Sequence, residues 1–355
     1  MKKTPDNNYN DNFHHDNYTS EKREYVDISS GQVTNTKKFP WLKIISILFF
    51  SLIGTLGGAM IYAYSTLISF NYDDLSGDTS SDISSNSSEN YSESNINDSM
   101  VLNVLLLGTD TRSTTDNGRS DTIMLASLDL RHKKIKLTSL MRDIWVTIPK
   151  HQKDRLNAAY SYGGPKLAIE TIQQNFGVAI DRYASVDFES FAKIVDHLGG
   201  IDMELTSQEV AYLNTHSGSP NKLRGSGVKH LDGLQALNHA RNRDSLGSDY
   251  DRTQRQRNVI ETILNKMKEA NLSQITKIIS DVAPMITTNF KPSEITKLAT
   301  NSLTYLNFEV EQFRLPTNDN VKNATIDQKM VLVINDMEKA KKDLSKFIYE
   351  EYSTK

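Results

Sequence analysis

From about residue 100 onward, short apolar runs alternate with longer segments in which apolar residues recur at helical spacing. The short runs predict strands over residues 101–107, 122–129, 134–140, 144–148, 201–205 and about 308–315. The longer segments predict helices over residues 165–176, 188–198, 252–270, 271–281, 292–304 and 335–350. Strands that alternate with helices favour an α/β fold with a mixed central β-sheet flanked by helices, an α/β/α sandwich.

Local signals mark the ends of several predicted helices. Gly164 and Pro165 start one of them in the favoured way, since proline is tolerated in a first turn, and Gly177 ends it. Two further pairs have the spacing of capping boxes, Thr206 with Glu209 and Asp232 with Gln235.

The first hundred residues lack this alternation. Residues 1–40 are polar, which predicts a disordered tail. Residues 41–69 contain an uncharged apolar run that is long enough to cross a bilayer as one transmembrane helix. Residues 70–99 hold ten serines, seven acidic residues and no basic residue, a composition typical of a flexible linker. The folded domain is therefore expected to span residues 100–355.

The flanks of the apolar run predict its orientation. Lys37, Lys38 and Lys43 lie on its N-terminal side, and the next basic residue on the other side is Arg112. The positive-inside rule then places the tail in the cytoplasm and the folded domain outside the cell, on a single-pass membrane anchor. A cleaved signal peptide is the main alternative, but the 40-residue lead argues against it. A buried core helix is the other.

The chain contains no cysteine, which excludes disulfides, thiolate zinc sites and cysteine nucleophiles. A domain of about 250 residues can be stable through its hydrophobic core alone. The net charge of −3 is unevenly distributed, because the acidic linker precedes a mildly basic domain.

Residues 241–257, RNRDSLGSDYDRTQRQR, contain five of the 14 arginines and none of the 27 lysines. Arginine binds phosphate through two parallel hydrogen bonds and keeps its charge, so this bias favours an oxyanion site. Arg252, Arg255 and Gln256 share one face at the start of the predicted helix, where the helix dipole favours an anion. A solvated surface with ion pairs to the neighbouring aspartates fits this segment alone equally well.

Arginine and aspartate also occur together at three predicted strand ends. The pairs are Asp110 with Arg112, Arg119 with Asp121, and Arg142 with Asp143. Carboxylates are hard ligands for Mg²⁺, and guanidinium groups hold phosphates. Ligands of open α/β sheets bind at strand ends. One pair would be an ordinary salt bridge, but three pairs favour a magnesium–phosphate site.

Five motifs then make the sequence recognisable. In chain order they are VLNVLLLGTDTR, GRSDTIMLASLD, RLNAAYSYGGP, ALNHARNRD and DYDRTQRQRNVI. Together, over residues 100 to about 316, they resemble the LytR-CpsA-Psr family. Members of that family attach anionic glycopolymers, such as wall teichoic acid or capsule, to peptidoglycan, and they take them from a polyprenyl diphosphate carrier.

The resemblance implies roles for individual residues. Asp110 and Asp121 are the implied ligands of Mg²⁺, which Mn²⁺ can replace. The implied catalytic residues are Arg119, Asp121, Arg142, Asp143 and Arg241. The implied diphosphate-binding residues are Arg112, Arg155, Arg243, Arg252, Arg255 and Gln256. Two positions depart from the family pattern: Met141 stands where proline is common, and Asp251 stands where glycine is common and adds a negative charge beside Arg252.

The implied reaction is phosphoryl transfer from the polyprenyl-diphosphate-linked glycopolymer to a hydroxyl of a peptidoglycan sugar, with release of polyprenyl phosphate. The general base is left open between Asp121 and Asp143. The apolar helices between residues 165 and 213 are either ordinary core or, by the resemblance, partly the lining of a tunnel for the lipid tail. A membrane-anchored regulator and a diphosphate hydrolase remain alternatives, and nucleic acid is excluded as a partner if the domain lies outside the cell.

Overall fold

The computed structural model describes residues 71–73, 75, 98–109, 118, 120–242 and 249–350. The predicted tail, the predicted transmembrane helix and most of the predicted linker lie outside these residues. Among the helices that are described, none has both the length and the apolar character needed to cross a membrane. The membrane anchor at residues 41–69 therefore stays a prediction.

A mixed β-sheet forms the centre of the described domain, as predicted. Its strands, in the order in which they lie side by side, are β1 (Asn71–Tyr72), β10 (Thr287–Thr288), β7 (Arg182–Asp187), β2 (Val101–Thr109), β3 (Ser120–Asp129), β4 (Lys134–Leu140) and β11 (Glu309–Leu315). β2 pairs in parallel with β7, and β4 pairs in parallel with β11, whereas β3 is antiparallel to both of its neighbours. The carboxyl ends of β2, β7, β4 and β11 and the amino end of β3 therefore share one edge.

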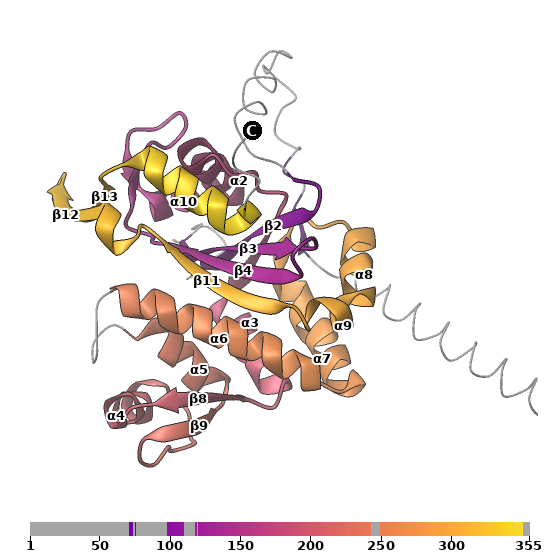
Figure 1. Ribbon diagram of the computed structural model, residues 1–355. Helices are drawn as coiled ribbons and strands as arrows, with labels where there is room; N and C mark the ends of the chain where they lie inside the picture. Colours follow the sequence, from indigo (N-terminus) through magenta and orange to yellow (C-terminus); the bar gives the residue numbers. More distant parts are fainter. Residues whose placement is uncertain are drawn as a thin grey trace, which may run out of the picture. The chain divides into compact units, whose positions relative to one another are not determined.

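Helices cover both faces of the sheet, which confirms the predicted α/β/α layering (Figure 1). α2 (Leu156–Phe176) and α10 (Met337–Tyr349) pack on one face. The other face is covered by α3 (Phe188–His197), α5 (Gly233–Arg241) and α6 (Asp249–Glu269), and α7 (Leu272–Val282) packs against α3. Both capping boxes form, at Thr206 and at Asp232.

Smaller elements complete the described chain. The hairpin β8 (Ile201–Leu205) and β9 (Gly227–Leu231) lies beside α5 and α6, with α4 (Ser207–His216) next to α5. A second hairpin, β12 (Val321–Ile326) and β13 (Lys329–Ile334), projects near the edge of the sheet that these strand ends share (Figure 1). The remaining elements are β5 (Trp145–Val146), β6 (Asp154–Arg155), η1 (Ala283–Met285), α8 (Pro292–Thr300), α9 (Ser302–Tyr305) and η2 (Asn318–Asn320).

The two faces of the sheet are packed differently. One hydrophobic core joins the sheet to α2 and α10, and a second core joins α3, α5 and α6 to the β8–β9 hairpin without including the sheet. In β2, Leu105 and Leu107 are buried in the first core, while the alternate residues Val104, Leu106 and Gly108 are only partly buried. Successive strand residues point to opposite faces, so the second face of the sheet is left incompletely covered.

Several elements differ from the sequence predictions. α2 begins at Leu156 rather than at Pro165, and Gly163 and Gly164 kink it with non-helical dihedrals, so the glycine–proline signal marks a break inside a longer helix. The predicted strand at 144–148 shrinks to β5, and the helix predicted at 292–304 is divided into α8 and α9. β7, β9 and β12 were not predicted, because their mixed polar sequences lack a clear apolar pattern. β13 was missed although its sequence, KMVLVI, is almost wholly apolar.

Candidate active site

The predicted site residues that the structure describes converge on the shared edge of the sheet. Asp121 lies at the start of β3, and Arg142 and Asp143 follow β4. Arg142 forms an ion pair through Nη1 with Asp121, and its Nε lies 3.4 Å from Oδ2 of Asp143. Arg155 in turn donates from Nη1 to Oδ1 of Asp143 at 3.2 Å. The four side chains alternate in charge and form one continuous network.

Electrostatics keep Arg142 charged within this network. Burial opposes the charge, but the carboxylates of Asp143, Asp121 and Asp249 outweigh it and raise the pKa of Arg142 above its ordinary value. Asp249, the first residue of α6, therefore belongs to the electrostatic surroundings of a residue that follows β4. This interaction shows that the start of α6 lies close to the strand ends.

The first turns of α6 bring further buried cations to the same place. Arg252 is ion-paired with Asp249 at 2.8 Å, and Arg255 donates to the carbonyl of Asn242 at 2.6 Å. Nε of Arg155 and Nε of Arg255 are buried without a hydrogen-bond partner among the described residues. Such donors are costly unless a ligand or water satisfies them, and an oxyanion suits a guanidinium best.

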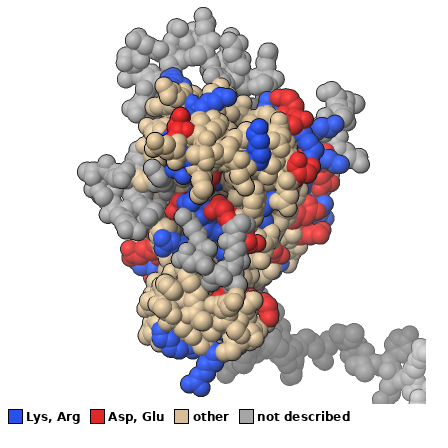
Figure 2. Space-filling model, turned by 90° about the vertical axis from the view of Figure 1, so that its left-hand side faces the viewer, with Lys and Arg blue, Asp and Glu red and all other residues tan. Residues whose placement is uncertain are grey.

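An apolar cavity of about 190 Å³ opens beside this charged network, between the sheet and the helices of its second face. Leu106 and Met124 line it from the sheet, and Phe191, Ile194 and Ile260 line it from the helices. Among the described residues, the polar part of its lining consists of Thr122, which follows Asp121, and of Asp187, Arg241 and Gln256. Figure 2 shows acidic and basic side chains gathered in the middle of one face of the molecule.

Arg241 and Arg257 show that the arginines of the 241–257 segment do not all serve one site. The guanidinium of Arg241 lies 3.9 Å from the centre of the Phe188 ring and borders the cavity. Arg257 instead donates from Nε to Gln312 of β11 at 3.1 Å. Burial, helped by the nearby Arg314, lowers the pKa of Arg257 to about 10. Arg257 therefore joins α6 to the sheet, although its Nη1 is also buried without a hydrogen-bond partner among the described residues.

Four predicted site residues lie outside the described residues: Asp110, Arg112, Arg119 and Arg243. The Mg²⁺ pair of Asp110 and Asp121 is thus described at Asp121 only, and the metal stays a prediction. The donor chemistry at the described positions suits such an ion, because Asp121, Asp143 and Asp249 offer hard carboxylate oxygens beside the arginines.

Two residues of the site were not predicted from the sequence. Asp187 ends β7, pairs in register with Thr109, borders the cavity and caps α3 by accepting from the Ser190 N–H at 2.7 Å. An aspartate three residues before Ser190 is a helix-capping signal in the sequence, but the strand β7 that ends at Asp187 was not predicted. Phe188 lies beneath Arg241, and nothing in its sequence context distinguishes it from an ordinary core residue.

Comparison with known proteins identifies the family. A profile of the LytR_cpsA_psr family matches residues 63–346. The chain belongs to this family. The predicted resemblance is thereby confirmed, over a stretch that includes the whole central sheet and every described residue of the site.

Individual relatives share about a quarter to a third of their aligned residues with this chain. The chain is 32% identical to the polyisoprenyl-teichoic acid–peptidoglycan teichoic acid transferase TagU of Enterococcus faecalis, over 72% of this chain and 80% of that protein. It is 32% identical to the regulatory protein MsrR of Staphylococcus aureus, over 55% of this chain and 58% of that protein. A solved structure of TagT bound to LI-WTA matches with a TM-score of 0.59 and 25% identity, over 71% of this chain and 92% of that one.

Proposed function

We propose that this protein is a phosphotransferase that moves an anionic glycopolymer from a polyprenyl diphosphate carrier to peptidoglycan. A sugar hydroxyl of peptidoglycan attacks the phosphorus next to the glycopolymer, and the bond from this phosphorus to the oxygen of the polyprenyl phosphate breaks. The hydroxyl proton leaves with a base, a new phosphodiester forms, and polyprenyl phosphate departs with the bond electrons.

The observation that carries the proposal is an apolar cavity that Arg241 and Gln256 border, at the edge of the sheet where further arginines gather. Arg241 and Gln256 border the cavity, and Arg252 and Arg255 precede Gln256 on the same helix. A ligand that fits both parts has an apolar tail and an anionic head, which is the character of a polyprenyl diphosphate. A free nucleotide or a sugar phosphate would leave the apolar part unused.

The charged residues stabilise the head group and its transition state. Arg142, Arg155 and Arg241 are placed to neutralise charge that develops on the phosphate oxygens, and the contacts with Asp121, Asp143 and Phe188 fix their positions in advance. Asp121, together with Asp110, would hold Mg²⁺, which supplies further charge neutralisation on the diphosphate. Asp143 and Asp121 remain the candidates for the base.

The relatives support this assignment by their names. TagU of E. faecalis, which aligns with most of this chain, is a teichoic acid transferase, and the TagT structure holds LI-WTA on the same fold. By the same proposal, residues 41–69 anchor the protein in the membrane, and the domain acts outside the cell, where both substrates lie.

The test uses the full-length protein in detergent with Mg²⁺, a polyprenyl-diphosphate oligosaccharide and a peptidoglycan oligomer, followed by mass spectrometry. The proposal predicts a phosphodiester-linked conjugate and free polyprenyl phosphate, both reduced at least about 100-fold by Arg241→Ala. Release of polyprenyl phosphate without a conjugate would indicate a hydrolase. An untouched donor that does not bind would favour the regulatory role that the name of MsrR suggests.

A further inference from the structure

The β12–β13 hairpin is attached directly to the active-site segment after β4. The Leu332 N–H donates to the carbonyl of Asp143 at 2.9 Å, and Ile144 and Leu332 form a parallel bridge. Lys329, at the start of β13, donates to Asp154 at 2.7 Å, just before Arg155. The hairpin is thus held at two points of the segment that carries Asp143 and Arg155.

A cleft of about 530 Å³ lies between this hairpin and the start of α6, and we refer to it as the hairpin cleft. Its lining comes from both sides, with Asp143, Asp249 and Tyr250 on one side and Asn323, Thr325 and Met330 of the hairpin on the other. Asp143 and Asp249 also contact the arginines of the phosphate site, through Arg155 and Arg252. The hairpin cleft and the apolar cavity therefore adjoin the same network, yet no described residue lines both.

The lining of the hairpin cleft suits a neutral sugar chain. Asn323 and Thr325 offer hydrogen-bonding side chains, and Met330, paired in register with Thr325, exposes 81% of its surface. Sugar rings present hydroxyl groups at their edges and apolar C–H faces, so they need such a mixture. A flexible, exposed methionine at the rim of a polar cleft supplies an adaptable apolar contact for such a face.

The charge of the lining indicates which of the two substrates, acceptor or donor, occupies the hairpin cleft. Among the described residues, the ionisable side chains that line the hairpin cleft are the carboxylates Asp143 and Asp249 and the phenol of Tyr250, whereas Arg241 borders the apolar cavity. Asp143 is ion-paired with Arg155, and Asp249 with Arg252, so neither carboxylate is an unbalanced negative charge. Their oxygens can still accept hydrogen bonds from sugar hydroxyls. The described lining of the cleft therefore offers hydrogen-bond acceptors to an uncharged glycan, whereas Arg241 offers a cation to the anionic donor in the apolar cavity.

We propose that the hairpin cleft binds the glycan strand of the acceptor and presents its hydroxyl to the network at Asp143. This inference rests on the proposed transferase function and adds a binding site to it. The β12–β13 hairpin then determines acceptor specificity, while the cavity and arginines bind the donor.

The test compares Met330→Asp and Asn323→Ala with Val228→Asp in the full-length protein. Val228 is the matched control, because it is a large apolar residue on another two-stranded hairpin and is 66% exposed. We expect Met330→Asp to raise the KM for an uncharged peptidoglycan oligosaccharide about 10-fold, and Asn323→Ala to raise it by less, with the Kd of the polyprenyl diphosphate unchanged. Val228→Asp should change neither quantity.

Direct binding keeps this proposal separable from the proposed reaction. Calorimetric titration of the oligosaccharide into the protein without donor should show binding that Met330→Asp weakens about 10-fold. If transfer fails but this weakening is observed, the reaction assignment is wrong and the glycan site stands. If the oligosaccharide binds all proteins equally, or if the variants alter the Kd of the donor instead, the hairpin cleft is not the acceptor site.

Discussion

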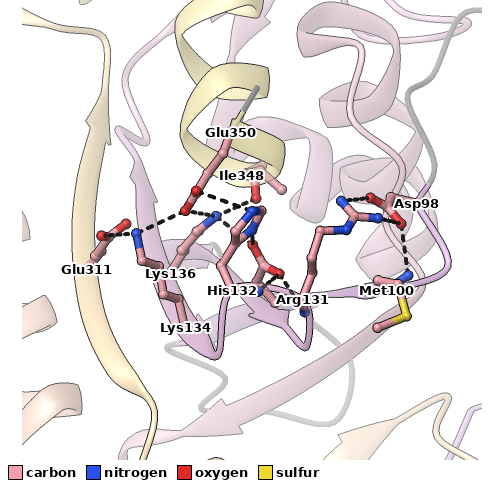
Figure 3. A network of polar contacts seen from close by, with 10 residues as sticks. Asp98, Met100, Arg131, His132, Lys134, Lys136, Glu311, Ile348 and Glu350 are labelled. Atoms are coloured by element: carbon pink, nitrogen blue, oxygen red, sulfur yellow. Dashed lines mark hydrogen bonds and ion pairs between the residues drawn. The ribbon is translucent and has the colours of Figure 1, made fainter. Parts of the chain in front are cut away.

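β3 and β4 carry a charged cluster at each end, and the two clusters are built differently. At the end away from the site, Lys136 is fully buried and donates to Asp129 at 2.8 Å and to the carbonyl of Ile348 at 2.8 Å, with Glu350 at 3.1 Å (Figure 3). We call the residues Asp129, His132, Lys134, Lys136, Glu311 and Glu350 the far cluster. Its ammonium and carboxylate groups lie in mutual contact, and it fixes the end of α10 to the sheet.

The cluster at the active-site end lacks this closure. Its arginines are held by Asp121, Asp143 and Asp249, but Nε of Arg155 and of Arg255 has no partner among the described residues, and a cavity opens beside them. Charges that saturate one another stabilise a fold, whereas pre-positioned cations with spare donors suit an anionic ligand. The two clusters differ in whether their charged groups all have partners, rather than in how many charges they contain.

The far cluster shows why proximity of potential ligand atoms is weak evidence for a metal site. Within the described residues, Asp129, His132 and Glu350 bring three potential ligand atoms within 4.8 Å of one another. Lys136 contacts two of the three, so an ammonium already supplies the positive charge that a metal would bring. The far cluster is therefore structural.

The largest expected effect follows from removing Arg142, which joins Asp121 to Asp143. Arg142→Ala should lower kcat for transfer about 1000-fold, roughly 4 kcal/mol, because charge on the diphosphate oxygens is no longer neutralised. The assay is conjugate formation by mass spectrometry. Arg131→Ala, which breaks an ion pair with Asp98 at the other end of β3, is the control and should change kcat less than about twofold. Equal losses in both variants would contradict the distinction between the two ends.

Lys136 gives the opposite pattern. Lys136→Met should lower the free energy of unfolding by about 3 kcal/mol, since it leaves the buried carboxylate of Asp129 without its ammonium partner. Urea denaturation of the folded domain measures this change. Lys134→Met, at the partly exposed pair with Glu311, should cost at most about 1 kcal/mol. Loss of transfer activity in folded Lys136→Met protein would argue that the far cluster takes part in function.

Acid should weaken the far cluster in a defined range. Burial alone would raise the pKa of Asp129, but its hydrogen bonds to Lys136 and His132 prevail and lower it from 3.8 to about 2. A carboxyl whose pKa is lower in the folded state stabilises the fold above its unfolded pKa and loses that contribution as the pH falls. Its contribution, about 2 kcal/mol, should therefore disappear between about pH 4 and pH 2.

Unfolding curves of the wild type and of Asp129→Asn at about pH 6, 5, 4 and 2 test this expectation. The difference in unfolding free energy between the two proteins should be constant from about pH 6 to about pH 5 and shrink below about pH 4. A difference that stays the same down to the lowest pH would show that the carboxyl is not stabilised in the way described.

The smallest effect is expected from the apolar cavity. Ile194→Trp should fill part of the space between the sheet and α3 and raise the KM of a long-chain polyprenyl donor about 10-fold, or roughly 1.4 kcal/mol. A donor with a short geranyl tail should be affected less. If both donors respond alike, the lipid tail does not extend past Ile194.

Leu105 and Leu106 show how far the sequence reaches. Both belong to one apolar run, which correctly predicts a strand, yet Leu105 is fully buried in the core and Leu106 lines the cavity. The hydrophobic pattern shows only that a residue is apolar, and both a packed core and an apolar ligand cavity are lined by apolar residues. The cavity could therefore not be located before the helices of the second face were placed.

The charged residues were more predictable than the elements around them. Asp121, Arg142 and Asp143 meet at one edge of the sheet, because strand ends with fixed direction bring them there. Arg155, on β6, joins them, and it was implied by the family resemblance rather than by a strand end. Asp187 was missed because β7, RYASVD, has no apolar run and is recognisable only by its pairing with β2. β12, in the hairpin that lines the second cleft, was missed for a similar reason, since it has only scattered apolar residues.

The proposed function requires that the apolar cavity and the arginine cluster bind one molecule with a lipid tail and a diphosphate head. A polyprenyl-diphosphate oligosaccharide with a diazirine on its tail would be bound to the full-length protein in detergent, irradiated, and the cross-linked peptides sequenced. We predict labelling of α3 and of α6 near Ile260, lost in competition with unlabelled donor and weakened by Arg241→Ala. Labelling spread over the surface, or labelling of α3 and α6 that Arg241→Ala leaves unchanged, would show that cavity and arginines do not bind one ligand.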